Sequence, residues 1–229
     1  MKKVSVGLII AMEEEFRALD GMISKRKEVF LNGIRFILGK INNVKIAIAL
    51  SGIGKVNAAR TTTTLSHAFS PECIISTGVA GGLGKLSKLS VVIADGLVQH
   101  DIDLTSFGRQ KGALPGMESP VILATREIRD RLKKVAVSAN IGIIATGDQF
   151  IASESKALEI ANEFQAIACD MESAAVAQVA KLEGVPFGVI RVISDDAGKD
   201  ADEDFSAFLK KAANLNGHIV ADFLALYSK

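Results

Sequence analysis

The chain has 229 residues, of which 48% are hydrophobic and 23% are charged, proportions typical of a globular protein with a large core. Its 27 basic and 26 acidic side chains nearly cancel, which gives no electrostatic reason to expect nucleic acid or an anionic membrane as a partner. No apolar run approaches the roughly 20 residues of a transmembrane helix, and no segment has the pattern of a signal peptide. We therefore expect a cytoplasmic protein whose ligand is a small molecule.

The first part of the chain combines buried strands with glycine-bearing loops. Nearly continuous apolar runs predict strands over residues 4–12, 34–38, 44–50 and 73–77. Asn42 and Asn43 suit the tight turn of a hairpin between two of these strands. A glycine loop at 51–55 precedes a predicted helix at 56–69, although the threonine run in this helix is a poor helix former. A second glycine loop, at 78–82, directly follows a strand.

In the second part of the chain, strands and helices alternate around one long irregular segment. Strands are predicted over residues 90–99, 141–145 and 186–193. Helices are predicted over residues 125–136, 153–164, 170–182 and 205–226. Residues 100–120 form a polar, glycine-bearing segment that does not read as core, and such segments often carry function or lie at interfaces.

This alternation predicts a single α/β domain over residues 1–229, with no linker, internal repeat or low-complexity tract. We expect a three-layer sandwich, in which a central mixed β-sheet is flanked by helices on both faces. Several of the predicted strands end in glycine or aspartate. Because ligands of such folds collect at the carboxyl ends of strands, these strand ends are where a site is expected.

Acidic residues gather at strand ends and helix starts. The acidic run at 13–15 is either a solvent-exposed helix start, which the helix dipole favours, or the source of a general base that points into a cleft. Asp170 and Glu172 leave a similar choice, since aspartate is a common N-cap. Asp195 ends an apolar strand, where it faces a ligand or caps a helix. Arg191, inside that strand, is costly to bury alone and is expected to meet a carboxylate.

The glycine loops, cysteines and histidines are individually weak signals. Neither glycine loop has the spacing of a Walker loop or a dinucleotide fingerprint, and ordinary turns explain both. Cys73 and Cys169 lie in apolar runs without CxxC spacing, so we expect buried, reduced thiols; a nucleophilic thiol or a zinc site is the alternative. The histidines show no triad or metal spacing. His67 and His218 are expected on helix surfaces, and His100 stays open.

Together these clusters, in this order, resemble the 5'-methylthioadenosine/S-adenosylhomocysteine nucleosidase family. The matching segments lie within positions 7–197 and read GLIIAMEEEF, ALSGIGKVNAARTTTTL, ISTGVAGGL, LVQHDIDLTSFG, ATGDQFI, ACDMESAAVAQVA and VPFGVIRVISDDA. Each motif alone is unspecific, but the combination is highly specific. The resemblance implies a nucleoside phosphorylase-like fold and hydrolysis of the N-glycosidic bond of 5'-methylthioadenosine and S-adenosylhomocysteine. It implies no metal and no organic cofactor.

The resemblance also implies roles for individual residues. Glu15 would be the base that activates water, and Asp195 would protonate nitrogen 7 of adenine. Glu172 would bind the ribose hydroxyls and stabilise the cationic sugar, beside Met171. Arg191 would help to orient Glu15, Glu172 or the water.

The remaining implied contacts concern the substrate and a second subunit. Phe150 would stack on adenine, the backbone of Ile151 would bind its edge, and three side chains would line the 5'-alkylthio pocket: Met12, Ile53 and Phe205. Three residues of the 100–120 segment would reach into the neighbouring subunit's site, which implies a homodimer: Leu104, Phe107 and Pro115.

The loop TGVAGG departs from the pattern of many family members. Val79, Ala80 and Gly81 would line the site, but Val79 stands where many members have serine, so a hydroxyl contact near the ribose is missing. A subset of the family that also cleaves 6-amino-6-deoxyfutalosine resembles this chain here and in the stretches LVQHDIDL and TGDQF. That nucleoside and 5'-deoxyadenosine are therefore further candidate substrates.

Two other functions remain as alternatives. A purine nucleoside phosphorylase resembles this family in fold but must hold phosphate near the first strand. Here that position reads AMEEE, whose carboxylates repel phosphate and which Arg17 alone does not offset. A non-catalytic nucleoside-binding protein would not need ionisable groups at both Glu15 and Asp195.

Overall fold

The computed structural model describes residues 3–84, 86–198 and 201–227. Within these residues, ten strands form one mixed sheet. The strands are β1 (Val6–Ile10), β2 (Ser24–Leu31), β3 (Ile34–Ile41), β4 (Val44–Leu50), β5 (Cys73–Gly82), β6 (Val91–Gln99), β7 (Ile122–Leu123), β8 (Asn140–Thr146), β9 (Ala166–Asp170) and β10 (Phe187–Asp195). The helices are α1 (Glu13–Asp20), α2 (Lys55–Phe69), the 3-10 turn η1 (Thr105–Phe107), α3 (Arg126–Val135), α4 (Glu154–Phe164), α5 (Ser173–Leu182) and α6 (Ala201–Tyr227).

The sheet divides at β5. Along most of its length β5 lies between β1 and β10, and both of these strands run parallel to it. At Gly81 and Gly82 it pairs instead with β9, which runs antiparallel to it. Since β10 also pairs with β6, the strands β5, β10, β6, β8 and β9 close into a ring, while β1, β4, β3 and β2 extend the sheet outwards.

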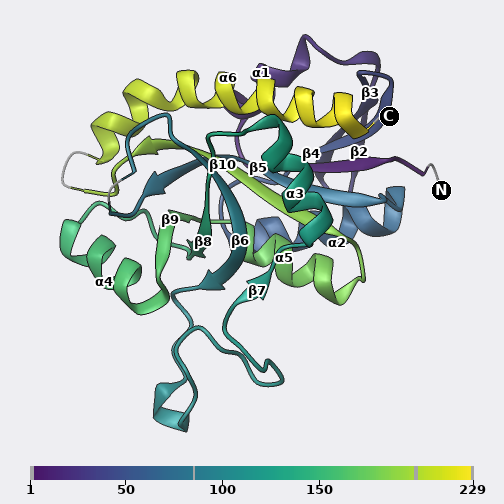
Figure 1. The fold of residues 1–229 in the computed structure, drawn as a ribbon. Helices are drawn as coiled ribbons and strands as arrows, with labels where there is room; N and C mark the ends of the chain where they lie inside the picture. Colours follow the sequence, from purple (N-terminus) through teal and green to yellow (C-terminus); the bar gives the residue numbers. More distant parts are fainter. Residues whose placement is uncertain (1–2, 85, 199–200, 228–229) are drawn as a thin grey trace.

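Helices cover both faces of the sheet, so the expected three-layer α/β architecture is confirmed. The long helix α6, drawn in yellow across the top of Figure 1, packs on β5 and β10 and contacts α1 and α3. Helices α2 and α5 pack together on the opposite face, and α4 lies against β8 and β9. Each face buries its own apolar cluster, with Leu65 and Val176 on the α2–α5 side and Phe16 and Phe223 on the α6 side. None of the described helices is both long and apolar enough to cross a lipid bilayer.

Several element predictions need correction. β2 was not predicted because most of its side chains are exposed; it is held in the sheet mainly by its backbone pairing with β3. The short strands β7 and β9 were missed, and the helix expected from residue 170 begins at Ser173 because β9 runs up to Asp170. The last helix was expected from residue 205 and begins at Ala201.

The turn between β3 and β4 agrees with its sequence. Asn42 and Asn43 both have positive φ, of 49° and 66°. Two-residue hairpins prefer such conformations, and asparagine adopts them more readily than most residues. The predicted hairpin is thus confirmed.

Candidate active site

A cavity of about 330 Å³ opens at the carboxyl ends of the strands around the division in the sheet. Its volume lies within the range usual for small-molecule sites. The predicted site residues that line it are Met12, Glu15, Ile53, Val79, Ala80, Gly81, Phe150, Ile151, Met171, Glu172, Asp195 and Phe205. Residues that line it without having been predicted as site residues are Ala11, Gln149, Cys169, Asp170 and Ser194.

Glu15 is held by backbone N–H groups from two elements. Its Oε2 atom accepts hydrogen bonds from Ala11 (3.2 Å) and Met12 (3.0 Å), which precede α1, and its Oε1 atom accepts one from Val79 (2.9 Å) at the end of β5. A Cβ atom on Gly78 would lie 2.3 Å from Oε1, so only glycine permits this approach. Glu13 and Glu14 are exposed at the helix start, while Glu15 is buried at the cavity, and its role as a general base stays a prediction.

Burial raises the pKa of Glu15 above its ordinary value, while the charge of Arg191 and the three N–H groups oppose that rise. Helix α6 supports the arrangement from behind. The Asn216 side chain donates a hydrogen bond to the Gly78 carbonyl (2.7 Å) and accepts one from the Thr77 hydroxyl. Asn216 therefore fixes the strand end that presents the Val79 N–H group to Glu15. No feature of the sequence pointed to Asn216.

Glu172 lies at the start of α5, where it occupies the N-cap position. Its Oε1 atom accepts a hydrogen bond from the Gly54 N–H group (2.9 Å), in the glycine loop before α2. Burial, together with the nearby charge of Asp170, raises the pKa of Glu172 to about 7, against the lowering effects of Arg191 and of the Gly54 N–H group. Near neutral pH this carboxyl group therefore populates both protonation states.

Arg191 meets a carboxylate, as its burial required, and the partner is Asp170. The Nε atom of Arg191 lies 2.8 Å from Asp170 Oδ2, in an ion pair whose side chains are 3% and 1% exposed. A second guanidinium nitrogen donates to the Ser76 hydroxyl (3.1 Å). Thr146 and Ser173 donate to the remaining positions of the Asp170 carboxylate. The pair is thus fully hydrogen-bonded, the condition under which a buried ion pair is tolerated.

The expected role of Arg191, to help orient Glu15, Glu172 or the water, stays a prediction. Its side-chain hydrogen bonds go to Asp170, Ser76 and a main-chain carbonyl, and none of them goes to Glu15 or Glu172. Arg191 influences those two carboxylates through its charge, which lowers the pKa of both. The sequence signal for Asp170 was present, since it begins the segment DMES, but the N-cap interpretation concealed its pairing with Arg191.

Asp195 ends β10 inside the site. Its Oδ2 atom accepts a hydrogen bond from the Ser194 hydroxyl (2.9 Å), and its Oδ1 atom accepts one from the Ala197 N–H group (3.0 Å). Burial is the largest cause of the raised pKa of Asp195, and the charge of the neighbouring Asp196 adds to it. A Cβ atom on Gly81 would lie 3.0 Å from Oδ1, so the glycine of β5 leaves room for the carboxyl group.

Aromatic and aliphatic side chains stand at the mouth of the cavity. Phe150 and Phe205 pack edge to face, with ring centroids 6.0 Å apart and ring planes at 80°. Phe150 and Ile53 are about half exposed, at 49% and 51%. A flat, largely apolar ligand would cover these surfaces, which otherwise face water.

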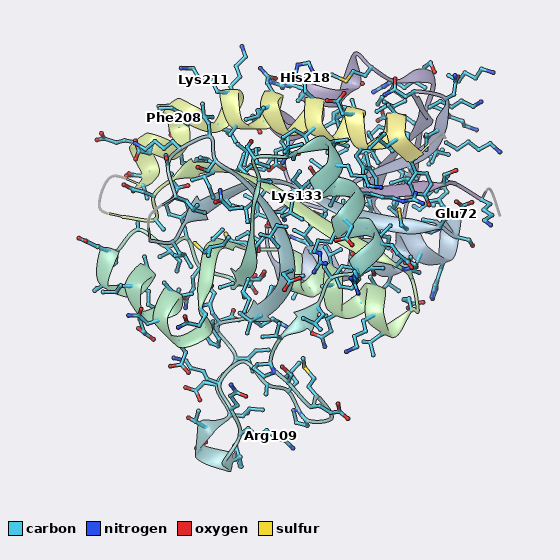
Figure 2. All side chains as sticks on the ribbon, viewed as in Figure 1. Glu72, Arg109, Lys133, Phe208, Lys211 and His218 are labelled. Atoms are coloured by element: carbon cyan, nitrogen blue, oxygen red, sulfur yellow. The ribbon has the colours of Figure 1, made fainter. Side chains whose placement is uncertain are left out.

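Part of the segment 100–120 projects away from the body of the molecule (Figure 1), while His100 at its start is buried. Arg109 lies at the far end of this segment in Figure 2. The cavity lining contains none of the three residues predicted here, Leu104, Phe107 and Pro115, and Phe107 is 80% exposed. Within one chain, therefore, these residues do not reach the site.

The histidines and cysteines supply no evident reactive group. His67 is exposed and lies 2.8 Å from Glu183, and His218 is exposed on the outer side of α6 (Figure 2). His100 is buried against Gly147. Cys73 and Cys169 are free and buried, and burial raises the pKa of both thiols, which disfavours the nucleophilic thiolate. Among the described residues, no group of three or more metal-binding side chains is placed to hold an ion.

Comparison with known proteins accounts for this constellation. The chain matches the phosphorylase superfamily over residues 5–225. The 5'-methylthioadenosine/S-adenosylhomocysteine nucleosidase of Geobacillus thermodenitrificans is 37% identical over 231 residues, which cover 97% of each protein. This chain belongs to the 5'-methylthioadenosine/S-adenosylhomocysteine nucleosidase family.

Solved structures of the nucleosidase family share the fold. The enzyme of Neisseria meningitidis, in complex with methylthio-immucillin-A, matches with a TM-score of 0.94 and 35% identity, over 97% of this chain and 99% of that one. The futalosine hydrolase of Helicobacter pylori matches with a TM-score of 0.92 and 35% identity, over 96% of this chain and 97% of that one. The resemblance seen in the sequence and the nucleoside phosphorylase-like fold are both confirmed.

Proposed function

We propose that this chain hydrolyses the N-glycosidic bond of 5'-methylthioadenosine and S-adenosylhomocysteine, releasing adenine and the corresponding thioribose. The observation that carries the proposal is the set of buried carboxyl groups on one cavity: Glu15, Glu172 and Asp195. Most of the other lining side chains are apolar or aromatic, as a thioether substituent and a purine require. Near relatives carry this activity in their names.

The acid of the reaction is Asp195. Cleavage leaves an electron-poor, oxocarbenium-like sugar and an electron-rich purine, and adenine departs more readily once nitrogen 7 is protonated. The raised pKa of Asp195 keeps a proton available on this group at higher pH than for an ordinary aspartate. The Ser194 hydroxyl and the Ala197 N–H group hold the carboxyl group in place for this transfer.

The base is Glu15. Its three backbone hydrogen bonds favour the carboxylate over the acid, and its position at the cavity lets it take a proton from an attacking water. Glu172 binds the ribose hydroxyls, and its negative charge stabilises the cationic sugar of the transition state. The acid and the base act on opposite sides of the sugar, as in inverting glycosidases.

The acidic lining argues for hydrolysis over phosphorolysis. Among the described residues, no lysine or arginine lines the cavity. The nearest guanidinium, that of Arg191, is already paired with Asp170. Of the described residues that line the cavity, several are carboxylates and none is a cation, so binding of a phosphate ion there is electrostatically unfavourable. A non-catalytic binding role, in turn, leaves the separate placement of Glu15 and Asp195 unexplained.

Product analysis tests the proposal. Purified protein is incubated with 5'-methylthioadenosine, with and without inorganic phosphate, and adenine and the sugar product are identified. We expect free methylthioribose at a rate that does not depend on phosphate. Methylthioribose 1-phosphate formed only with phosphate would identify a phosphorylase, and tight binding without any cleavage would identify a binding protein.

Two finer properties belong to the same proposal. The resemblance to futalosine hydrolase supports 6-amino-6-deoxyfutalosine as a further substrate, and 5'-deoxyadenosine fits the same apolar lining. Adenine release from each nucleoside, measured as kcat/KM, ranks them.

The protein acts in the cytoplasm as a homodimer, in which the projecting segment carries Leu104, Phe107 and Pro115 to the partner's site.

A further inference from the structure

Three segments that border the cavity are joined by hydrogen bonds between residues that do not line it. The glycine loop before α2 reaches it through Lys55, the segment after β6 through Asp101, and the loop after β8 through Asp148. None of these three side chains lines the cavity. The reaction proposed above therefore leaves them without a role.

The three residues form a closed set of hydrogen bonds. Asp148 Oδ1 accepts from the Lys55 backbone N–H group (2.7 Å), and the Asp148 backbone N–H group donates to Asp101 Oδ2 (3.0 Å). Lys55 Nζ closes the set by donating to Asp101 Oδ1 at 2.6 Å. The side chains of Lys55 and Asp101 are only 17% and 16% exposed. We call this triad of Lys55, Asp101 and Asp148 the loop clamp.

On one side the loop clamp is joined to Glu172. Gly54 directly precedes Lys55, and its N–H group donates to Glu172 Oε1. Gly54 has a φ of +101°, and a Cβ atom there would lie 3.1 Å from Asp148 Oδ1. The bond from Asp148 to the Lys55 N–H group thus fixes the peptide next to the one that binds Glu172.

On the other side the loop clamp is joined to the aromatic mouth of the cavity. Asp148 is followed directly by Gln149, Phe150 and Ile151, all of which line the cavity. A displacement of Asp148 would therefore move both the Gly54 N–H group and the surface on which a purine stacks. Sub-ångström positioning of this kind governs catalytic rate.

We propose that the loop clamp positions Glu172 and Phe150 for the reaction. Its members are positioning residues, since none of them touches the cavity, and this inference rests on the proposed hydrolase function. Glu172 also faces the charges of Asp170, Arg191 and Glu15, none of which the loop clamp contacts. Loosening the loop clamp weakens the Gly54 contribution to the electrostatics of Glu172, and Asp148→Ala and Lys55→Met each also remove a charge near that carboxyl group.

Two substitutions of Asp148 separate positioning from bulk stability. Asp148→Ala removes the acceptor for the Lys55 N–H group, and we expect kcat to fall by about tenfold, the size of one lost hydrogen bond that involves a charged group. Asp148→Asn keeps an acceptor oxygen and should restore most of kcat. Asp130→Ala is the control, because Asp130 is also ion-paired but lies on α3. Circular dichroism checks that each variant is folded.

A direct titration tests the loop clamp without relying on turnover. Carbon-13 NMR of the Glu172 carboxyl group follows its protonation in the unliganded protein. Because the Gly54 N–H group lowers the pKa of Glu172, we expect that pKa to be higher in Asp148→Ala than in Asp148→Asn, which loses the same charge but keeps the acceptor, and to stay at the wild-type value in Asp130→Ala. Lys55→Met, which keeps the backbone bond to Asp148, should produce a smaller rise.

The outcomes distinguish the two proposals. Wild-type kcat in folded Asp148→Ala protein, with a Glu172 titration equal to that of Asp148→Asn, would overturn the loop clamp, whatever the activity of the wild type. If Asp148→Ala does not fold, an unchanged Glu172 titration in Lys55→Met overturns it instead. Wild-type protein that releases no adenine while the titration shifts as expected would overturn the hydrolase function and leave the loop clamp standing.

Discussion

Of the carboxyl groups that line the cavity, the three with proposed roles each have a different set of partners. Glu15 accepts three backbone N–H groups, Glu172 accepts one, and Asp195 accepts one N–H group and a hydroxyl. Burial disfavours the charged form of all three, so the number of hydrogen-bond donors decides how far the charged form of each is stabilised. Glu15, the carboxylate with the largest number of hydrogen-bond donors, suits a base. Asp195, with another carboxylate beside it, suits an acid.

Replacing the proposed acid tests this division at the scale of one residue. Asp195→Asn keeps the size and the hydrogen-bond acceptor but cannot transfer a proton to the purine. We expect kcat for 5'-methylthioadenosine to fall by roughly 10²–10⁴-fold with no change in the circular dichroism spectrum. The adjacent Asp196→Asn is a matched control, because Asp196 is exposed and does not line the cavity. Equal activities for the two variants would remove Asp195 from the mechanism.

At the scale of elements, the start of α5 carries a cost in stability. Glu172 has a folded-state pKa of about 7 against an ordinary 4.5. A raised pKa means that the folded protein binds this proton more tightly than the unfolded chain does. The contribution of Glu172 to stability is therefore complete below pH 4.5 and is lost as the pH rises towards 7.

Glu172→Gln should remove that penalty, since glutamine can still accept the Gly54 N–H group. We expect the variant to exceed the wild type in free energy of unfolding by on the order of 3 kcal/mol at pH 8, and by much less at pH 5. Activity should be lost at both pH values. Urea unfolding at fixed protein concentration measures the first effect. A stability difference of the same size at both pH values would show that the carboxyl charge is not its cause.

Which elements the sequence predicts depends on how they are covered. β1, β5 and β10 are buried along most or all of their length, so the sequence of each is a largely apolar run. β2 is an exposed edge strand, and its residues carry no such pattern. β9 has only five residues. Its last residue, Asp170, also contributes its carboxylate to the site, so the sequence of β9 resembles the start of a helix.

The residues of the site also differ in how far the sequence predicts them. Strand-end glycines and carboxylates are visible in the sequence, but Glu15 was distinguishable from its two acidic neighbours only through the family resemblance. Contacts between distant loops leave no pattern at all. Lys55 and Asp148 are separated by 93 positions, and Asp170 and Arg191 by 21, so only the folded chain reveals these pairs.

At the scale of the whole molecule, we propose that the projecting segment forms the contact between two subunits. Phe107 is 80% exposed in one chain, which is costly for an aromatic side chain without a partner. We expect Phe107→Ala to lower kcat/KM for 5'-methylthioadenosine by about tenfold through loss of its burial in the partner's site. Phe30→Ala is the control, since Phe30 is 65% exposed on the edge strand β2.

Mixing two defective variants examines the shared site directly. In a mixed dimer of Phe107→Ala with Asp195→Asn, one site combines an intact Asp195 with an intact partner Phe107. Activity above the sum of the separate variants is therefore expected after subunit exchange. Sedimentation shows whether dimers are present. Purely additive activity in proven mixed dimers would place Phe107 outside the partner's site.

The ring of strands has a consequence for how the protein is made. β10 is inserted between β5 and β6, although more than 80 residues separate it from the nearer of the two along the chain. The strand that closes the ring also carries Asp195, whereas Glu15 is synthesised almost at once. A chain growing on the ribosome therefore contains the proposed base, Glu15, long before it contains the proposed acid, Asp195. Adenine release would begin only after β10 has paired, which makes turnover itself a reporter of completed folding.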